Sequence, residues 1–534
     1  MQPEIRRYLT NIDTVSTQQF FTDVLVVGAG VSGLRAAIEA SEKCSVTLVC
    51  KDTLEKSNSW LAQGGIASVL DKDDSLESHY EDTIRTGCGL CNNETVRLVV
   101  QNGPKLVHEL KDWGTEFDMV GDKFAATLEG GHSFARIAHS HGDSTGRGIT
   151  EALIRKARGI KNINIIEEFF TIDLITDQDK NCLGIIGYNS KLGTEIIWGG
   201  STILATGGAG RLYRETTNPR VATADGLAMA YRAGAVLADL EMMQFHPTTL
   251  YIAGASRALI TEALRGEGAI LIDCNGDRFM SDYNPAGELA PRDIVSQSIL
   301  SQMLKTNSTH VYLDVRHFKE GFFQKRFPYI YELCKDFDID VRKDLIPVRP
   351  SAHYMIGGIK TDLQARTNIK GLFAVGEAAA TGLHGANRLA SNSLVEGLVF
   401  GQIAGKNAAS DIDSAGIEAK RTRVNYHVPV SQRTVLDTAD VRNSLRALMW
   451  RNIGITRHEK ALQEAREIIL FWQRYVMDKV FDDYEGWECQ NMLTVAMLMA
   501  ESAQKRKESR GVHYRRDYPE KKEDFAFHIE TCMV

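Results

Sequence analysis

The segment HGANRLASNS, residues 384–393, gathers ionisable and amide side chains whose types suit the binding of a charged ligand. His384, Asn387, Arg388, Asn392 and Ser393 stand there between two apolar segments, GLFAVGEAAATGL and LVEGLVFG. Apolar flanks predict burial, and a buried guanidinium needs an anionic or strongly polar partner. The segment therefore predicts an internal site rather than a surface loop.

Four other segments carry cationic or ionisable side chains beside small residues. They are QFHPTTL with His246, TEALRGEG with Thr261, Glu262 and Arg265, LAPRDIV with Arg292, and SAHYMIGG with His353. Taken singly, each histidine could be a satisfied core residue and each arginine a domain-interface charge. Together with Arg388 they form a set of three arginines and two histidines, and arginine is shaped to bind carboxylate through two parallel hydrogen bonds. The set predicts a site for a small dianion.

A glycine-rich turn predicts a second ligand. VLVV, residues 24–27, is followed by GAGVSG, by the helical pattern LRAAIEASEK and by the strand pattern VTLVCK. In this strand–turn–helix context Gly28 permits the tight turn, Gly30 the approach of a pyrophosphate, and Gly33 close packing of helix and strand. Packing of the helix alone is the alternative explanation. Lys51 stands where an acid that binds ribose is usual, so we expect it to contact adenosine or phosphate.

Two further strands that end in glycine predict how these segments are positioned. TILATGGAG (202–210) and GLFAVGEAA (371–379) fit a doubly wound α/β sheet with the ligand at the carboxyl ends of its strands. We predict a discontinuous dinucleotide domain over residues 1–240 and 353–424, interrupted by an inserted domain at 241–352. After a polar linker around 410–423, three apolar patterns of helical period predict a helical domain at 425–534.

Composition excludes several classes of protein. The 534 residues carry a net charge of −7 with a pI of about 6.1, which argues against a nucleic-acid partner, and acids interleave the basic cluster near residues 504–516. Nine scattered cysteines indicate a reducing compartment, and the Cys88–Cys91 pair lacks the second pair that a zinc site needs. The first apolar run is too short to span a bilayer. We predict a cytoplasmic protein without metal or membrane.

Nine motifs occur in an order typical of one family. They are GAGVSG, SNSWLAQGGIA, ATGGAG, QFHPT, TEALRGEG, RFM…APRD, HYMIGG, GEAAATGLHGANRLASNSL and KESRG. Over nearly its whole length the chain resembles the succinate dehydrogenase/fumarate reductase flavoprotein family. The resemblance implies FAD, rather than a nicotinamide cofactor, in a Rossmann-like domain, together with an inserted α+β capping domain and a C-terminal helical domain.

The resemblance also implies which residues hold the cofactor. They are Gly28, Ala29, Gly30, Val31, Ser32, Gly33, Lys51, Asn58, Ser59, Trp60, Leu61, Ala62, Gln63, Gly64, Gly65, Asp225, Glu377, Asn392, Ser393 and Leu394. Asn392 is expected at the flavin end, and Glu377 replaces the commoner aspartate. Respiratory members carry, at the position of Asn58, a histidine that bonds covalently to FAD. Because an amide nitrogen is a poor nucleophile, we predict non-covalent FAD.

Within the family, LEGGHS, TEALRGEGA, TGLHGANR and KESRGVHYRRDYP resemble the branch that oxidises L-aspartate to iminoaspartate, with hydride passing from C2 to flavin N5. The implied carboxylate ligands are His246, Thr261, His353 and Arg388, with Gln244 beside them. Arg292 is the implied catalytic arginine, and Glu129 is expected to bind the α-ammonium, with a plain salt bridge as its alternative. The product would enter quinolinate and NAD synthesis, with a possible link to quinolinate synthase, and oxygen or fumarate would reoxidise the flavin.

Two other functions stay open at this point. A soluble fumarate reductase or a succinate dehydrogenase flavoprotein subunit would share the same pocket, although Asn58 and Glu129 count against both. A non-catalytic flavin-binding or assembly protein is the third possibility, but binding alone would not require Arg292.

Overall fold

The largest sheet contains every strand that the glycine-ended motifs predict. A computed structural model describes residues 5–255, 257–412, 423–428 and 436–533, so most of the predicted linker lies outside the described residues. The sheet has the order β8-β3-β2-β11-β10-β9, and β18 pairs with the end of β11. Its strands are β2 (Gln18–Val27), β3 (Val46–Val49), β8 (Ile163–Ile166), β9 (Phe169–Thr176), β10 (Cys182–Asn189), β11 (Gly193–Leu204) and β18 (Leu372–Ala374).

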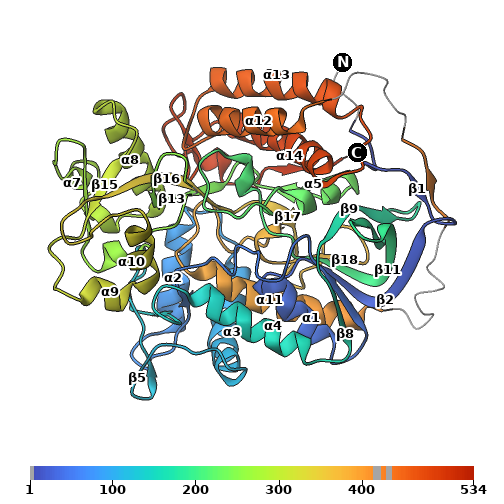
Figure 1. Cartoon of the computed structure of the whole chain (residues 1–534), viewed down its shortest axis with the longest axis horizontal. Coiled ribbons are helices and arrows are strands. Elements are labelled where there is room, and N and C mark those ends of the chain that lie inside the picture. Colours follow the sequence, from blue (N-terminus) through green and yellow to red (C-terminus); the bar gives the residue numbers. More distant parts are fainter. Residues whose placement is uncertain (1–4, 256, 413–422, 429–435, 534) are drawn as a thin grey trace.

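Both faces of this sheet are covered, which explains why its central strands are continuously apolar. Side chains alternate along β2: Val24 and Val26 join the apolar cluster of helix α1, whereas Leu25 and Val27 join the cluster of helix α14. Helices α1, α11 and α4 lie on one side and the C-terminal helices on the other (Figure 1). The helices on the two faces are α1 (Val31–Ala40), α4 (Thr145–Arg158), α5 (Asp225–Arg232), α11 (Asn392–Ser410) and α14 (Tyr484–Lys505).

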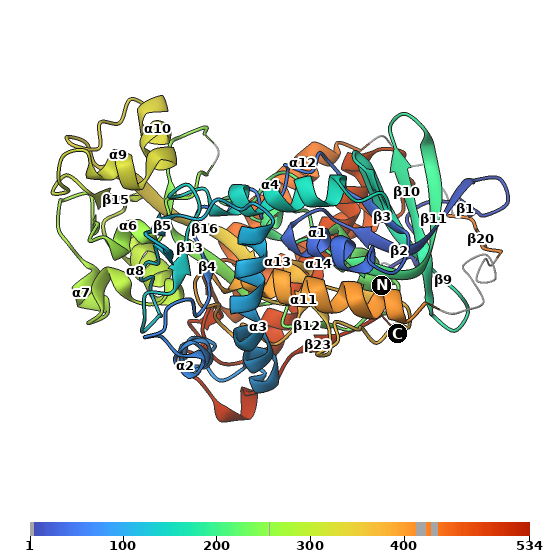
Figure 2. The same ribbon diagram turned by 90° about the horizontal axis from the view of Figure 1, so that it is seen from below.

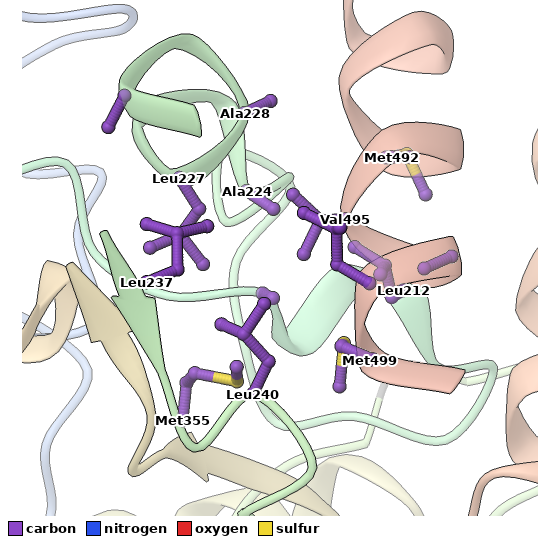
Figure 3. Packing of buried hydrophobic residues seen from close by; sticks show 14 of the residues in the cluster. Leu212, Ala224, Leu227, Ala228, Leu237, Leu240, Met355, Met492, Val495 and Met499 are labelled. Carbon is purple, nitrogen blue, oxygen red and sulfur yellow. The ribbon is translucent and has the colours of Figure 1, made fainter. Parts of the chain in front are cut away.

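The C-terminal helices are packed against the sheet domain through apolar side chains. Leu227 of α5, Leu212 and Leu240 lie close to Val495 and Met499 of α14 (Figure 3). The predicted helices are confirmed as α12 (Thr438–Asn452), α13 (Glu459–Val476) and α14. The basic segment that follows is a domain contact, because Arg506 Nε donates to Glu241 Oε1 at 2.6 Å and is fully buried.

The inserted region forms a second unit at the end of the molecule away from the large sheet (Figures 1 and 2). Its antiparallel sheet has the order β13-β16-β15-β14, from β13 (Met243–Leu250), β14 (Ile270–Ile272), β15 (Val311–Asp314) and β16 (Ile346–Met355). Its helices are α6 (Ala263–Gly266), α7 (Met280–Tyr283), α8 (Arg292–Lys305), α9 (Phe322–Arg326) and α10 (Pro328–Asp336). Leu271, Ile299, Phe327 and Val348 belong to its own core. The predicted fold class is confirmed, while the exact domain limits stay a prediction.

Shorter elements complete the chain. Helices α2 (Leu76–Thr86) and α3 (Asn93–Asp112) lie between the sheet domain and the inserted unit (Figure 2). A small sheet joins β19 (Ala379–Ala380), β17 (Gly358–Lys360), β12 (Leu237–Ala238) and β23 (Glu530–Thr531). Two-stranded pairs are β1 (Ile12–Asp13) with β20 (Asn425–Tyr426), β4 (Ile66–Ala67) with β7 (Ile137–Ala138), β5 (Met119–Val120) with β6 (Lys123–Phe124), and β21 (Thr456–Arg457) with β22 (Tyr514–Arg515). Among the described residues, no helix is long and apolar enough to cross a membrane.

Candidate active site

The turn between β2 and α1 requires two of its glycines. Gly28 has φ +109°, and a Cβ there would lie 2.2 Å from the carbonyl oxygen of Ala205. A Cβ on Gly33 would lie 1.9 Å from the carbonyl oxygen of Gly28. The tight turn and the close helix–strand packing are thus confirmed. Gly30 is the N-cap of α1 and offers no side-chain cap. The Val31 N–H donates to Ser59 Oγ at 3.1 Å, so a ligand such as a pyrophosphate would be bound by the other N–H groups of the first turn.

Two adjoining cavities extend from this turn and share Ser32, Asn58, Ser59 and Glu377. The first is lined by Gly28, Ala29, Gly30, Lys51 and Asp225, among others. The second, of about 820 Å³, is lined by Val31, Leu61, Ala62, Gln63, Ser393, Leu394 and His353, among others. Most of the predicted cofactor residues therefore border one continuous space at the carboxyl ends of the parallel strands.

Four predicted cofactor residues support the walls of this space instead. A Cβ on Gly65 would lie 2.3 Å from Cγ2 of Ile137, so Gly65 allows close packing on β7. A Cβ on Gly64 would lie 3.8 Å from Glu129 Oε1, which places Gly64 beside the predicted ammonium ligand. Trp60 packs against the sheet-domain core, with the Arg147 guanidinium 5.7 Å from its ring centre. Gly33 acts through helix packing.

Asn392 is placed differently from the prediction. Its Oδ1 is 2.9 Å from His79 Nε2, and its Nδ2 donates to Thr83 Oγ1 at 3.1 Å. Both ends of the amide are thus bound to α2, so this side chain anchors the start of α11 rather than facing the flavin end. The sequence could not reveal this because His79 and Thr83 are about three hundred residues away.

Lys51 is held by two carboxylates. Its Nζ lies 2.7 Å from Asp225 Oδ2 and 2.5 Å from Glu488 Oε1, and it donates to Thr223 Oγ1 at 2.6 Å. Although burial opposes the charge, Asp225 and Glu488 hold the pKa of Lys51 above its usual value. Because Glu488 belongs to α14, the C-terminal domain contributes to the wall of the cofactor cavity.

Asn58 and Glu377 form a buried pair at the junction of the two cavities. Asn58 Nδ2 donates to Glu377 Oε2 at 2.8 Å, and the Met355 N–H donates to Oε1 at 2.9 Å. Burial raises the pKa of Glu377 to about 7. The pair therefore presents polar oxygens and an amide to whatever occupies the cavity.

Arg292 lies at the centre of the predicted substrate cluster. Its Nε donates to Glu262 Oε2 at 2.5 Å, and its Nη1 donates to Gln244 Oε1 at 3.3 Å. Arg265 Nη2 is 3.6 Å from the other oxygen of Glu262, so one carboxylate bridges two arginines. Burial opposes ionisation of Glu262, but Arg292 and Arg265 hold its pKa below the usual value. As the first residue of α8, Arg292 is fixed by a helix whose N-cap is Pro291.

Gln244 connects Arg292 to Arg388. Gln244 Nε2 donates to the carbonyl oxygen of Arg388 and to Asn387 Oδ1, each at 2.9 Å. Arg388 Nη1 donates to Ser393 Oγ at 3.2 Å, while its Nε is buried without a hydrogen-bond partner among the described residues. Burial, together with the charge of Arg292, lowers the pKa of Arg388 to about 10. The charges of the two guanidiniums are thus close enough to affect one another, while their binding of a dianion stays a prediction.

The ring of Tyr354 packs against the guanidinium of Arg388. The Arg388 guanidinium lies 4.5 Å from the ring centre of Tyr354, a cation–π distance. The Tyr354 hydroxyl donates to Glu396 Oε2 at 3.0 Å, and His384 Nε2 lies 2.8 Å from the same oxygen. Sequence reasoning missed Tyr354 and Glu396. The sequence did hold a signal for each: Tyr354 directly follows His353, and Glu396 lies in the helix that follows the HGANR segment.

His246 and His353 lie with ring centres 5.2 Å apart. Burial and then Arg292 lower the pKa of both well below the usual value, so both are neutral at pH 7. His246 Nδ1 lies 3.1 Å from the carbonyl oxygen of Thr248 and 3.3 Å from the Thr248 N–H, while Nε2 is buried without a hydrogen-bond partner among the described residues. Thr261 is buried on the segment that leads into α6. These groups can donate to a carboxylate.

Glu129 faces the same cluster from the loop before β7. Ser391 Oγ donates to its Oε2 at 2.8 Å, and its Oε1 has no partner among the described residues. Burial, and then the charge of Glu262, raises the pKa of Glu129, against the opposing effects of Arg292 and Arg388. Glu129 does not form the plain salt bridge that was the alternative, because its hydrogen-bond partner among the described residues is the hydroxyl of Ser391. A cation placed at Oε1 would stabilise the ionised carboxylate.

Comparison with known proteins agrees with this site. The family model "FAD binding domain" matches residues 23–394, and "Fumarate reductase flavoprotein C-term" matches residues 442–534. The L-aspartate oxidase of Nostoc is 42% identical over 98% of this chain and 95% of its own, and the chloroplastic L-aspartate oxidase of Arabidopsis thaliana is 40% identical over 95% and 82%. A mutant of the E. coli quinol fumarate reductase FrdA superposes with a TM-score of 0.89 at 34% identity over 97% of this chain and 95% of its own.

The fold, the paired cavities and these matches define a flavoprotein of the fumarate reductase type with an FAD-binding domain. Within that class, the chain belongs to the L-aspartate oxidase family.

Proposed function

We propose that the protein oxidises L-aspartate to iminoaspartate, using FAD bound without a covalent link. The proposal that L-aspartate is the substrate rests on one arrangement. Arg292, Arg388 and His246 belong to one buried cluster, and Glu129 adds an oxygen that has no partner among the described residues. Cationic donors suit two carboxylates, and a carboxylate suits an α-ammonium. Succinate, which has no ammonium, would leave Glu129 unpaired.

The residues present fit FAD. The helix N-terminus at Gly30 suits the pyrophosphate. Gln63, whose buried Oε1 has no hydrogen-bond partner in the described part of the chain, lines the second cavity together with Ser393 and Leu394. Gly28 to Ser32, Lys51 and Asp225 would hold the adenosine and phosphates, and Asn58, Glu377 and Ser393 the ribitol and flavin. When bound, FAD supplies the acceptor for the two electrons that leave C2 as hydride. The amide of Asn58 supports non-covalent binding, since it donates to Glu377 and is no nucleophile.

The protein side chains then have separate tasks. His246, His353, Thr261 and Arg388 hold the carboxylates so that C2–H points at the cofactor, and Gln244 fixes the distance between Arg292 and Arg388. Arg292 would exchange a proton at the reacting carbon, and Glu262 at 2.5 Å connects it to Arg265 as a polar chain within the inserted region. Tyr354 positions Arg388.

Three features of the cellular role belong to the same proposal. The product is unstable in water and would be consumed in quinolinate formation, the first stage of NAD synthesis, so a functional link with quinolinate synthase follows. Oxygen or fumarate would accept the electrons. The nine cysteines, none of them paired, support a reducing cytoplasm.

The test is to mix the FAD-loaded protein anaerobically with L-aspartate or with succinate and to follow flavin absorbance. Bleaching by L-aspartate, and much slower bleaching by succinate, supports the proposal. The reverse order would favour a fumarate reductase or succinate dehydrogenase subunit, and no bleaching by either would favour a non-catalytic protein. Acid precipitation of the same sample should release the flavin into the supernatant; flavin retained in the pellet would contradict non-covalent binding.

A further inference from the structure

The outer part of the larger cavity is lined by guanidinium groups that the proposed chemistry does not use. Its described lining includes five arginines, which are Arg211, Arg214, Arg220, Arg257 and Arg446. Two glutamates, Glu215 and Glu377, are the carboxylates in that lining. Glu377 lies at the inner end beside Asn58, so Glu215 is the carboxylate that faces the arginines. We call these five arginines the arginine vestibule.

Glu215 cannot neutralise the vestibule. Arg214 Nε donates to its Oε1 at 3.0 Å, Arg257 Nε donates to Oε2, and Arg349 Nη1 lies 3.9 Å from Oε1. Burial opposes ionisation of Glu215, yet Arg257 and its neighbours hold its pKa below the usual value. One carboxylate is therefore shared by three arginines, and a surplus of positive charge remains.

Arg446 of the vestibule is held in place by main-chain oxygens. Arg446 Nη2 donates to the carbonyl oxygen of Arg214 at 3.1 Å, and its Nε donates to that of Tyr213 at 3.4 Å. Arg211 is half-buried among these groups. Burial, and then the charges of Arg446 and Arg220, lower the pKa of Arg211 to about 10. These guanidiniums thus repel one another, and an anion between them would relieve that repulsion.

The vestibule adjoins the proposed substrate site. The same lining includes His353, Tyr354 and Ser393. Ser393 accepts from Arg388, and Tyr354 lies beneath it. An anion between the outer arginines therefore lies in the same cavity as His353, a proposed carboxylate ligand, and as two residues that contact Arg388.

We propose that the arginine vestibule is an entry subsite for dicarboxylate anions, which speeds their association and favours dianions over the singly charged L-aspartate. The inference rests on the proposed function, because it takes the dicarboxylate site at the inner end as the destination. Charges of one sign that line a cavity with poorly polarisable walls focus the field and raise association rates of oppositely charged ligands, by about 10- to 1000-fold in strong cases. The effect weakens with ionic strength and leaves a neutral ligand such as oxygen untouched.

The experiment uses holoenzyme in which Arg211→Gln and Arg220→Gln are combined, since neither residue belongs to the proposed catalytic cluster. The matched control combines Arg97→Gln and Arg316→Gln, which remove the same charge from exposed positions paired with Glu77 and Asp314. Three second-order rate constants are measured by stopped flow: flavin reduction by low concentrations of L-aspartate, and reoxidation of chemically reduced enzyme by fumarate and by oxygen. Each is measured at low ionic strength and in about 0.5 M salt, where screening is nearly complete.

We expect the vestibule variant to lose about ten-fold in the fumarate constant and about three-fold in the L-aspartate constant at low salt, with the oxygen constant unchanged. High salt should bring the unsubstituted enzyme, the control and the variant together. Equal constants in variant and control would overturn the proposal, as would a parallel loss in all three constants. A weaker FAD affinity with unchanged dicarboxylate constants would also overturn it, because the arginines would then serve the cofactor phosphates. Failure of L-aspartate to bleach the unsubstituted enzyme would instead overturn the proposed function.

Discussion

At the scale of single residues, the site holds buried positive and negative side chains close together. Arg292 and Arg388 are near enough for their charges to interact, while Glu262 binds Arg292 at 2.5 Å and Glu129 keeps one oxygen without a partner among the described residues. Each of these groups is almost fully buried, so each contact with a ligand charge is made where water screens it poorly. Substitutions that keep the size of a side chain but change its charge, or the paired N–H groups of a guanidinium, should therefore have large and selective effects on turnover.

Arg292→Lys should lose most of the turnover while FAD stays bound. Lysine cannot contact Glu262 and Gln244 and still present a planar donor pair to the substrate. The loss of one such contact costs on the order of 2–4 kcal/mol, roughly 30- to 1000-fold in kcat. The measurements are steady-state kcat and the flavin spectrum of the purified variant. Turnover close to normal would remove Arg292 from the chemistry.

Glu129→Gln should separate the two substrates. The amide cannot pair with an ammonium, so kcat/KM for L-aspartate should fall about 100-fold, whereas fumarate reduction should change little because fumarate has no ammonium. Both reactions are to be measured on one preparation. Equal losses in the two would leave Glu129 with a structural role only.

Glu377 should make the stability of the FAD-free protein depend on pH. Burial raises its pKa to about 7 in the folded state, whereas the unfolded carboxyl has a pKa near 4.5. The folded state therefore holds the proton more tightly, and its stability falls as pH rises from about 4.5 to about 7 and then levels off, by at most about 3 kcal/mol. Glu377→Gln should remove this loss. Comparison of the two melting temperatures at pH 5 and pH 8 should show the variant gaining on the parent at pH 8; a constant difference would contradict the assignment.

At the scale of elements, the contact between α1 and the first turn positions the cofactor site. Gly33→Ala would place a methyl group 1.9 Å from the carbonyl oxygen of Gly28, so α1 must move away from the sheet and its N-terminus away from the phosphates. We expect a weaker FAD affinity by at least about ten-fold and a lower melting temperature, since overpacking typically costs about 1–3 kcal/mol.

Gly159→Ala is the control for this prediction. Its methyl group would lie 3.4 Å from the carbonyl oxygen of Lys156, an ordinary contact, at the C-cap of α4, where φ is −78° and the residue borders neither cavity. FAD titration followed by fluorescence quenching compares the two variants. Equal affinities would show that the close approach at Gly33 does not control the site.

Elements were also the scale at which the sequence was most informative. Short apolar runs, most of them followed by glycine, and apolar patterns of helical period located β2, β3, β11, β18 and the three C-terminal helices. Those signals are local. By contrast, the bridging role of Glu262, the tyrosine beneath Arg388 and the anchoring of Asn392 to α2 depend on partners brought together by the tertiary fold. A spacing pattern cannot report such partners.

At the scale of the whole molecule, three regions contribute to one cavity system. The sheet domain supplies the turn at Gly28, the inserted region supplies Tyr251 and Arg257, and α14 supplies Glu488, which holds Lys51. A ligand that fills this space contacts several regions at once, and the arginine vestibule gives it a positive entrance on a chain whose net charge is −7. Substrate attraction is thus local to the cavity mouth and does not depend on the overall charge.

The measurement that tests the central claim most directly compares L-aspartate with L-asparagine in anaerobic flavin reduction. The two have the same shape, but asparagine replaces the side-chain carboxylate by a neutral amide. If buried guanidinium and imidazole donors clamp both carboxylates, L-aspartate should bleach the flavin at least about 100-fold more efficiently, the cost of about 2–4 kcal/mol for one lost charge-assisted contact. Equal rates for the two would contradict the clamp.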